Sequence, residues 1–274
     1  MQHHSLSPIG CIHHMVRHRS MLRQLIYRDV MSRYQGSALG FLWAFAVPLM
    51  MLAVYSFVFG VIFQARFGNE TAQTSDVNFA LTLFCGLLVH GFCAECLTRA
   101  PLLMVQHPSY VKKIIFPLEL LPVMMISSTA VHLVINITVL LIGIIATTHM
   151  LPWTMMYLPL ILIPMMLFMV GISWFLASLG VFMRDIGQIT GLCSTLLLFL
   201  SPVFYPIERL PAHYQLFMRL NPLTPTIEAV RAVLLEGRAP DMTLLSIYML
   251  VSLVVAWGGY AWFQRTRSAF ADVM

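Results

Sequence analysis

Charged residues are scarce in this sequence. Only 10% of its 274 residues are Asp, Glu, Lys or Arg, whereas 59% are hydrophobic, and a soluble domain carries about 25% charged residues. A chain this apolar could not keep its surface in water. Because lipid offers no hydrogen-bond partner to open backbone groups, the composition predicts an all-α integral membrane protein.

Nucleotide-binding and catalytic signatures are also missing. A phosphate-binding loop needs a glycine-rich turn followed by Lys and then Ser or Thr, and neither lysine, Lys112 nor Lys113, follows a glycine. The apolar runs contain no HExxH, no GxSxG and no pair of aspartates. We therefore expect no ATPase or protease site in this chain. Charged groups deep in a bilayer mark ion and proton pathways, and their near absence here favours an energy source outside the chain.

The cysteines and basic residues predict neither a disulfide framework, a metal site nor a nucleic-acid partner. The five cysteines are an odd number, which argues against a disulfide framework. Cys93 and Cys96 form one CxxC, but no second pair exists to complete a zinc site, so we expect no metal. The 16 Lys and Arg against 11 Asp and Glu are dispersed between apolar runs, as membrane topology requires, and no nucleic-acid partner is expected.

Six apolar runs are long enough to span a bilayer, which takes about 20 residues at about 1.5 Å each. No charged residue occurs from Leu120 to Met183, a length that fits two spans with a break at His149 and Pro152. The predicted spans are about 38–63, 77–96, 120–146, 156–183, 186–204 and 244–263, within a domain at 37–274.

Basic residues predict the orientation of these spans. Of the 16 Lys and Arg, 11 fall on the side of the N-terminal segment, the second loop, the fourth loop and the C-terminus. The positive-inside rule then predicts that both termini face the cytoplasm. No signal-peptide core precedes the first span, so we expect this span to serve as its own insertion signal.

Two segments outside the spans are predicted to be helical. After a mobile tail at 1–14, residues 15–36 form an amphipathic helix whose apolar stripe includes Leu22, Leu25 and Val30. Such a basic helix lies in the membrane interface; a plain cytoplasmic helix is the alternative. Between spans five and six, residues 210–220 and 225–235 predict two short re-entrant outer helices that dip back toward the bilayer, because prolines stand near their starts.

The first span is rich in aromatic residues. At 100° per residue, five of them share one face, and Trp43 and Phe57 lie roughly opposite. Such a stripe either packs against other helices or lines a channel for sugar rings, and the pattern leaves both open. In the fifth span Gly187, Gly191 and Ser194 favour helix packing over a polar pathway. The five aromatic residues on one face are Phe41, Phe45, Tyr55, Phe59 and Phe63.

Five stretches together resemble the ABC transporter type-2 permeases that export polysaccharides. They run from about residue 20 to the end of the chain. The loop after the second span is similar to the family's KKxxFPxxxLP segment, although "QHPSY" just before it departs from the usual residues. The stretches are "YQGSALGFLWAFAVPLMMLAVYSFVFGVIF", "VKKIIFPLELLP", "VFMRDIGQI", "SPVFYPIERLP" and "LNPLTPTIEAVR".

This resemblance implies a permease subunit in the bacterial inner membrane, which moves a lipid-linked O-antigen, capsule or teichoic-acid-like glycan. Two copies would form the channel, and two separate ATPase subunits would bind ATP and Mg, so that no cofactor binds in this chain. A drug or lipid exporter of the same superfamily is the alternative, and the KKxxFP and NPLTP segments favour the glycan. A membrane enzyme has no supporting motif.

The resemblance also implies three groups of site residues. The substrate channel would use Phe41, Phe45, Tyr55, Phe59, Phe63, Trp43, Ser194 and Tyr205. The contact with the ATPase would use Arg99, Gln106, Tyr110, Lys112, Lys113, Arg184 and Asp185. The outer gate would use Pro206, Tyr214, Asn221, Pro222, Glu228 and Arg231.

Overall fold

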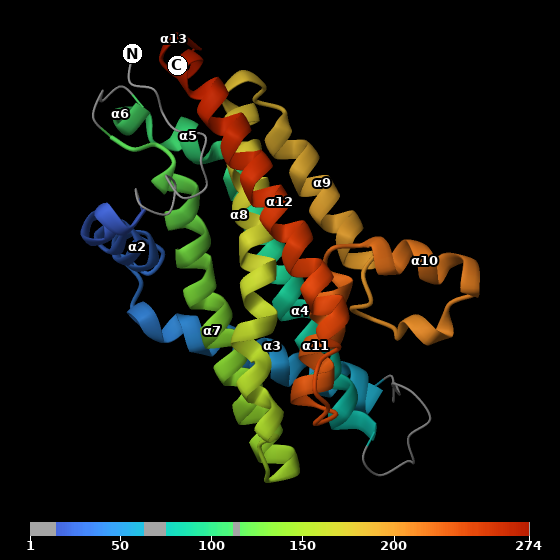
Figure 1. Ribbon diagram of the computed structural model, residues 1–274. Coiled ribbons are helices and arrows are strands. Elements are labelled where there is room, and N and C mark those ends of the chain that lie inside the picture. The colour runs from blue at the N-terminus through green and yellow to red at the C-terminus, as the bar shows by residue number, and fades with distance from the viewer. Residues whose placement is uncertain (1–14, 63–74, 112–115, 274) are drawn as a thin grey trace.

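The described part of the computed structural model, residues 15–62, 75–111 and 116–273, contains only helical elements. Four long helices run lengthwise through the molecule and α9 (Ile186–Phe199) lies along one side of them (Figure 1). One end of the bundle carries the short helices α5 (Leu103–Gln106), α6 (Pro108–Val111) and α13 (Phe270–Val273). We call this the α5–α6 end.

The four long helices coincide with four of the predicted spans and are candidate membrane spans. Each is apolar enough and long enough to cross a membrane. The break predicted at His149 is present, because this residue adopts the left-handed conformation (φ 55°) and ends the helix before it. The helices are α4 (Ser75–Arg99), α7 (Leu120–Thr148), α8 (Leu158–Phe182, after the 3-10 turn η4, Trp153–Tyr157) and α12 (Met242–Thr266).

The first predicted span is a compound helix. It consists of η1 (Gly40–Leu42), α3 (Trp43–Tyr55) and the π-helical η2 (Ser56–Ile62), and the stretch Gly40–Phe59 is a fifth candidate membrane span. Figure 1 shows α3 crossing α7 obliquely instead of running parallel to it. Only 11% of the most apolar part of Gly40–Phe59 is buried, so most of the surface of this compound helix faces outward.

The fifth predicted span, 186–204, is shorter than expected. Its helix α9 has 14 residues and ends at Phe199, which gives a length of about 21 Å against the ~30 Å of a bilayer's hydrocarbon core. Ser201 and Pro202 follow, and proline cannot continue the helical hydrogen bonding. Within the described residues the structure therefore has five helices of spanning length, and the prediction of six is not confirmed.

The core of the bundle is centred on α4. This helix contacts α3, α7, α8, α9 and α11 (Thr224–Leu234). Most of the apolar stretch that it contributes to the candidate span Phe79–Gln106 is buried. The helices α8 and α12 cross closely, because a Cβ added to Gly171 or to Gly259 would overlap the other helix's backbone. Small residues at such crossings let membrane helices approach closely.

The predicted amphipathic segment contains α2 (Arg19–Ser32). Leu25 and Val30 are buried, and Leu22 is packed against the core from the same stripe. The stripe lies on α7, on the outside of the bundle (Figure 1). The helix therefore uses its apolar face for a protein contact.

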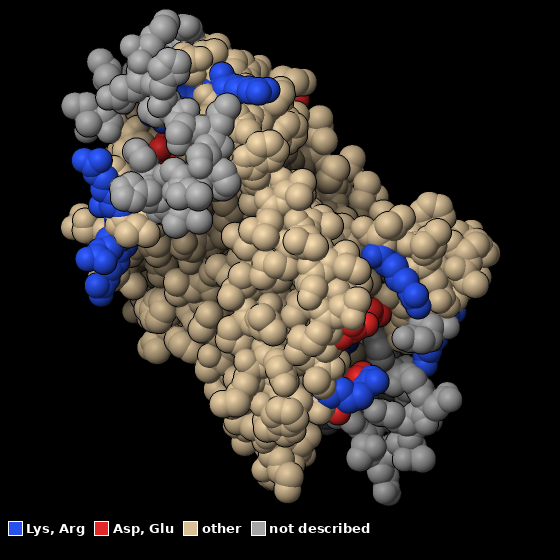
Figure 2. Space-filling model, in the orientation of Figure 1, with Lys and Arg blue, Asp and Glu red and all other residues tan. Residues whose placement is uncertain are grey.

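Short helices also form where the outer segment was predicted. They are η5 (Ile207–Arg209), α10 (Ala212–Leu220) and α11, which follow α9 and precede α12. On the face shown in Figure 2, charged side chains gather near α2 and the α5–α6 end and again near α10 and α11, with an uncharged surface between them. This surface is the one that a membrane would cover.

Candidate functional site

The segment that follows α4 carries the residues predicted to meet an ATPase. It runs through η3 (Ala100–Leu102), α5 and α6, and we call it the cytoplasmic segment after the side of the membrane that the sequence predicts for it. Gln106 is exposed at the end of α5. Tyr110 stacks on Phe116 with ring centroids 4.4 Å apart. Lys112 and Lys113 lie outside the described residues.

The remaining predicted contact residues are divided between two places. Arg184 and Asp185 are exposed in the turn between α8 and α9. Arg99, the last residue of α4, is instead half-buried and engaged in ion pairs inside the protein. Its guanidinium therefore serves an internal contact.

An ionic cluster surrounds Arg99. Its Nη2 donates to both carboxylate oxygens of Asp29 on α2, at 2.9 and 3.0 Å, and its Nη1 donates to Oε1 of Glu95 at 3.1 Å. Arg33 pairs with the same oxygen of Glu95. Two carboxylates and two guanidiniums thus balance one another at the joint of α2 and α4.

Hydroxyl groups of α7 complete this cluster. Ser128 donates to Oδ2 of Asp29, and Thr129 donates to Oε1 of Glu95 at 3.1 Å. Burial raises the pKa of Asp29, but the Ser128 hydrogen bond and the charges of Arg99 and Arg33 outweigh it, so its pKa lies below the ordinary value of 3.8. Asp29 is therefore ionised at neutral pH.

Two further contacts extend from α2. Arg28 donates from Nη2 to the hydroxyl of Tyr110 in α6 at 2.6 Å. On the other side, the hydroxyl of Tyr34 lies 3.0 Å from Nδ1 of His132 in α7, and its ring meets Phe41 edge-on at 5.5 Å. The helix α2 is thereby linked both to the cytoplasmic segment and to the start of the first span.

Asp29 was not among the predicted site residues, although its position in the sequence sets it apart. Asp29 follows Leu25 by four residues and Ile26 by three, so it lies on the apolar stripe of α2. A carboxylate in that position needs a partner from the neighbouring helix. Ser128 and Thr129 carry no such signal, because hydroxyl residues are common in membrane helices.

A buried arginine organises the opposite end of the bundle. Arg231 on α11 is 6% exposed. Its guanidinium donates to the carbonyl oxygens of Pro202 at 2.5 Å, Val203 at 2.8 Å and Thr82 at 3.2 Å. These carbonyls belong to the chain after α9 and to α4, so one side chain joins three elements.

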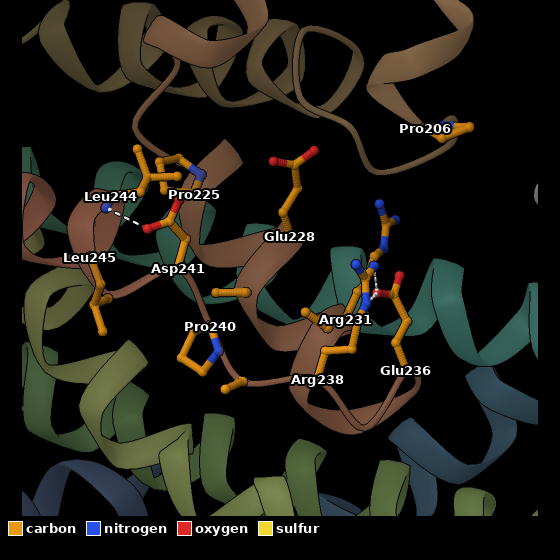
Figure 3. Close-up of a pocket in the computed structure, with 13 residues that line it drawn as sticks. Pro206, Pro225, Glu228, Arg231, Glu236, Arg238, Pro240, Asp241, Leu244 and Leu245 are labelled. Atoms are coloured by element: carbon orange, nitrogen blue, oxygen red, sulfur yellow. Dashed lines mark hydrogen bonds and ion pairs between the residues drawn. The ribbon is translucent and has the colours of Figure 1, made fainter.

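Three of the predicted gate residues line one pocket of about 420 Å³ beside Arg231, namely Pro206, Glu228 and Arg231 itself. Figure 3 shows the carboxylate of Glu228 extending from α11 into the space between the start of α12 and the loop of Pro206. Asp241 lies on the far side of this pocket, where its carboxylate caps α12 by accepting from the backbone N–H of Thr243 and Leu244.

The other gate residues lie elsewhere. Asn221 connects α10 to the end of α9, since its amide donates to the carbonyl of Leu200 at 2.8 Å and to the hydroxyl of Ser201 at 2.9 Å. Pro222 follows it and is half-buried, whereas Tyr214 is exposed on α10. Asn221 is thus a structural link between two helices.

The predicted channel residues are divided between packed and exposed positions. Phe45, Tyr55 and Phe59 pack against the core of the bundle, and Phe59 meets Phe79 of α4 at 5.5 Å. Phe41 and Trp43 are more than one third exposed. The predicted residue Phe63 lies outside the described residues.

The two channel residues associated with α9 are mostly covered. Ser194 is buried, and its carbonyl lies 3.0 Å from Nε2 of His90 on α4. Tyr205 donates its hydroxyl proton to the carbonyl of Phe199 at 2.6 Å. Both contacts hold α9 or its end in place.

A metal site was not expected, and in the ranges that the structure covers no three His, Cys, Asp or Glu side chains are close enough to hold an ion. Cys93 and Cys96 are buried in the core cluster on α4. Both are ordinary packing residues of that helix.

Comparison with known proteins gives a consistent set of relatives. Residues 21–235 match the family described as ABC-2 type transporter. The chain is 26% identical to the O-antigen export system permease protein RfbA of Myxococcus xanthus, over 96% of this chain and 99% of that protein. It is 24% identical to the RfbA permease of Klebsiella pneumoniae, over 90% and 92% of the two chains, and 20% identical to the polysialic acid transport protein KpsM of Escherichia coli, over 89% and 93%.

Proposed function

The chain belongs to the ABC-2 type transporter family, and from this premise we propose that it is the permease subunit of an exporter that carries a lipid-linked polysaccharide across the bacterial inner membrane. The observation that carries the proposal is its similarity, over nearly its whole length, to permeases named for O-antigen export. The sequence segments KKxxFP and NPLTP agree with this substrate class.

We propose that a separate ATPase subunit, which binds ATP and Mg, powers the export. Support comes from the chain's own sequence, which has no phosphate-binding loop. The exposed side chains of Gln106, Arg184 and Asp185 are available for such a partner. We propose that Tyr110, Lys112 and Lys113 belong to the same contact. Arg99 would act from within the protein, through its ion pairs.

A second copy of the chain would complete the channel. The apolar faces of α3 and α9 are largely exposed in one copy, and large side chains on them include Met50, Val54, Leu192 and Leu196. A sugar polymer needs a path that a single bundle with a filled core does not offer. We propose that the path lies between two copies, with Phe41 and Trp43 beside it. The more buried residues would hold the helices that border the path, namely Phe45, Tyr55, Phe59, Ser194 and Tyr205.

The outer gate would be formed by α10 and α11. Pro206, Glu228 and Arg231 already share one pocket, and Asn221 ties α10 to the end of α9. Movement of α11 would therefore alter both α4 and the end of α9 through Arg231. In this arrangement the two short helices are re-entrant, and both termini of the chain face the cytoplasm.

The test is reconstitution with an ATPase. The chain should co-purify with a separate ATPase subunit, should hydrolyse no ATP alone, and should restore surface polysaccharide in a strain that lacks its own permease. ATP hydrolysis by the isolated chain would contradict the proposal. Efflux of a small molecule or lipid, with surface polysaccharide unaffected by loss of the chain, would favour the drug or lipid exporter instead.

A further inference from the structure

The helix α2 is attached to both ends of the cytoplasmic segment. Asp29 holds Arg99, the residue immediately before η3, and Arg28 holds Tyr110 at the far end, in α6. Because Asp29 and Arg28 are adjacent in the sequence, residues 100–110 are bracketed from a single turn of α2. The segment cannot shift relative to α2 without breaking one of these contacts.

The contact between Asp29 and Arg99 is the more demanding of the two. The Asp29 side chain is 14% exposed and that of Arg99 is 28% exposed. One guanidinium nitrogen donates to both carboxylate oxygens, and Ser128 of α7 donates to one of them as well. An unpaired charge left in such a place costs far more than an exposed one.

The other end of α2 leads directly into the first span. Arg33 caps α2 and pairs with Glu95, and the Tyr34 ring packs edge-on against Phe41 just before α3. A displacement of α2 would therefore also displace the start of the first span, because Arg33 and Tyr34 connect the two and are held by contacts with Glu95 and Phe41. Among the described helices, α2 combines two connections. It contacts the cytoplasmic segment through the hydrogen bond from Arg28 to Tyr110, and it precedes η1 and α3 in the sequence.

We propose that Asp29 is the positioning residue that makes α2 and the cytoplasmic segment move as one body, so that a shift imposed on this segment by the ATPase is passed to the first span. We call this set of contacts, Asp29–Arg99 and Arg28–Tyr110, the α2 clasp. The inference rests on the proposed function, since it assigns a route from the ATPase to the channel. It gives Arg99 an internal role in place of direct docking.

The first experiment separates α2 from the segment. Asp29→Asn and Arg99→Gln each remove one charge of the pair, and the charge exchange Asp29→Arg/Arg99→Asp restores an opposite pair. In the purified complex we expect limited trypsin digestion at the arginines of α2 to become at least tenfold faster in the single variants, which corresponds to ~1.4 kcal/mol. The exchange should recover much of the protection. Glu236→Gln, which breaks an exposed ion pair with Arg238 at the opposite end, is the matched control and should digest like the wild type.

The second readout distinguishes coupling from folding. The single variants should assemble with the ATPase and hydrolyse ATP at a rate close to wild type, while polysaccharide export falls at least tenfold. Export and ATP hydrolysis falling by the same factor would overturn the proposal, because that pattern indicates a helix needed only for folding. Unchanged trypsin digestion of α2 in both single variants would overturn it too.

A cross-link provides an independent check. In a chain whose Cys11 and Cys193 are replaced by serine, Arg28→Cys and Tyr110→Cys are joined by a short bifunctional thiol reagent. If α2 and the segment move together, the cross-linked complex exports at least as well as the same variant before treatment. Lower export after cross-linking would mean that the two must separate, and would overturn the proposal.

Failure of the proposed function would look different. A wild-type complex that hydrolyses ATP but exports no polysaccharide would contradict the assignment of substrate. The trypsin protection of α2 by Asp29 and Arg99 does not depend on what is transported, so the α2 clasp is tested by that measurement in either case.

Discussion

The guanidinium Nε of Arg231 on α11 lies 3.2 Å from the carbonyl oxygen of Thr82 on α4 and donates a hydrogen bond to it. The same side chain binds the carbonyls of Pro202 and Val203 beyond the end of α9. The carbonyls of Pro202 and Val203 lie beyond the last turn of α9, so no N–H of that helix donates a hydrogen bond to them. Arg231 supplies the donors that this end of the bundle needs.

Loss of Arg231 should therefore destabilise the outer end. We expect Arg231→Lys to cost about 1–3 kcal/mol, because an ammonium group cannot reach three carbonyls in the fixed fork geometry of a guanidinium and leaves buried acceptors unpaired. Thermal unfolding in detergent measures this, and Arg219→Lys, at an exposed site on α10, is the control. Equal melting temperatures for the two variants would show that Arg231 does not hold these elements together.

The contact of α8 with η3 should tolerate no added methyl group. A Cβ on Gly180 would overlap the carbonyl of Pro101 in η3, whereas a Cβ on Gly187 would meet only the Leu102 side chain at 3.7 Å. Gly180→Ala should then cost about 1–3 kcal/mol by overpacking and displace the cytoplasmic segment, while Gly187→Ala should behave as wild type. Membrane expression and thermal unfolding would check this, and a stable, active Gly180→Ala would refute the close packing.

The aromatic residues of the first span should divide into two classes. Phe59 packs against Phe79 and the core, so Phe59→Ala should lower stability by about 2 kcal/mol, below the ~3–5 kcal/mol of a fully buried phenylalanine. Phe57 is 58% exposed, and Phe57→Ala should leave the unfolding temperature unchanged. If Phe59→Ala kept full stability and lost export, the channel-lining interpretation of this residue would be favoured over packing.

The two lysines of the second loop offer a test of ATPase docking. We expect Lys112→Glu combined with Lys113→Glu to weaken capture of the ATPase at least about tenfold, because the reversed charges would repel the surface that lysines attract. Insertion into the membrane should be unaffected. Pull-down of the ATPase from detergent-solubilised membranes measures the effect, and unchanged assembly and export would remove these lysines from the docking surface.

The stability that the α2 clasp contributes should fall at acidic pH. The pKa of Asp29 is lowered in the folded chain from its ordinary 3.8, so its contribution to stability is fully present above about pH 4 and is lost as pH falls through the lowered value. The difference in melting temperature between wild type and Asp29→Asn should stay constant from pH 8 to about pH 5 and shrink below about pH 4. A difference that vanished between pH 7 and pH 6 would point to another titrating group.

The long spans were predictable because each is decided locally. An uncharged run from Leu120 to Met183 with His149 and Pro152 at its centre can form only two membrane helices and a turn, and α7 and α8 follow that pattern. The fifth span was predicted too long because hydropathy does not register where a helix ends. Pro202 and the side-chain contacts of Asn221 with Leu200 and Ser201 decide that point.

The site was less predictable than the spans. Arg184 and Glu228 were named from segments that resemble the family, and the structure places Arg184 in the turn between α8 and α9 and Glu228 in a pocket beside α11. Asp29 was not named, although it interrupts the apolar stripe of α2, because a single acid in an amphipathic helix usually faces water. Its partners, Arg99 and Ser128, are 70 and 99 residues away in the sequence, and no periodicity links positions that far apart.

The sequence by itself determined that this chain is a helical membrane protein, which stretches of the sequence form the long helices, and which family it resembles. The composition and the charge-free runs suffice for this, since lipid accepts few other arrangements. Tertiary structure alone decided which polar groups meet: Asp29 with Arg99, and Arg231 with the carbonyl of Thr82. Such pairs depend on how separate helices cross, and the crossings are fixed by packing at positions such as Gly171 and Gly259.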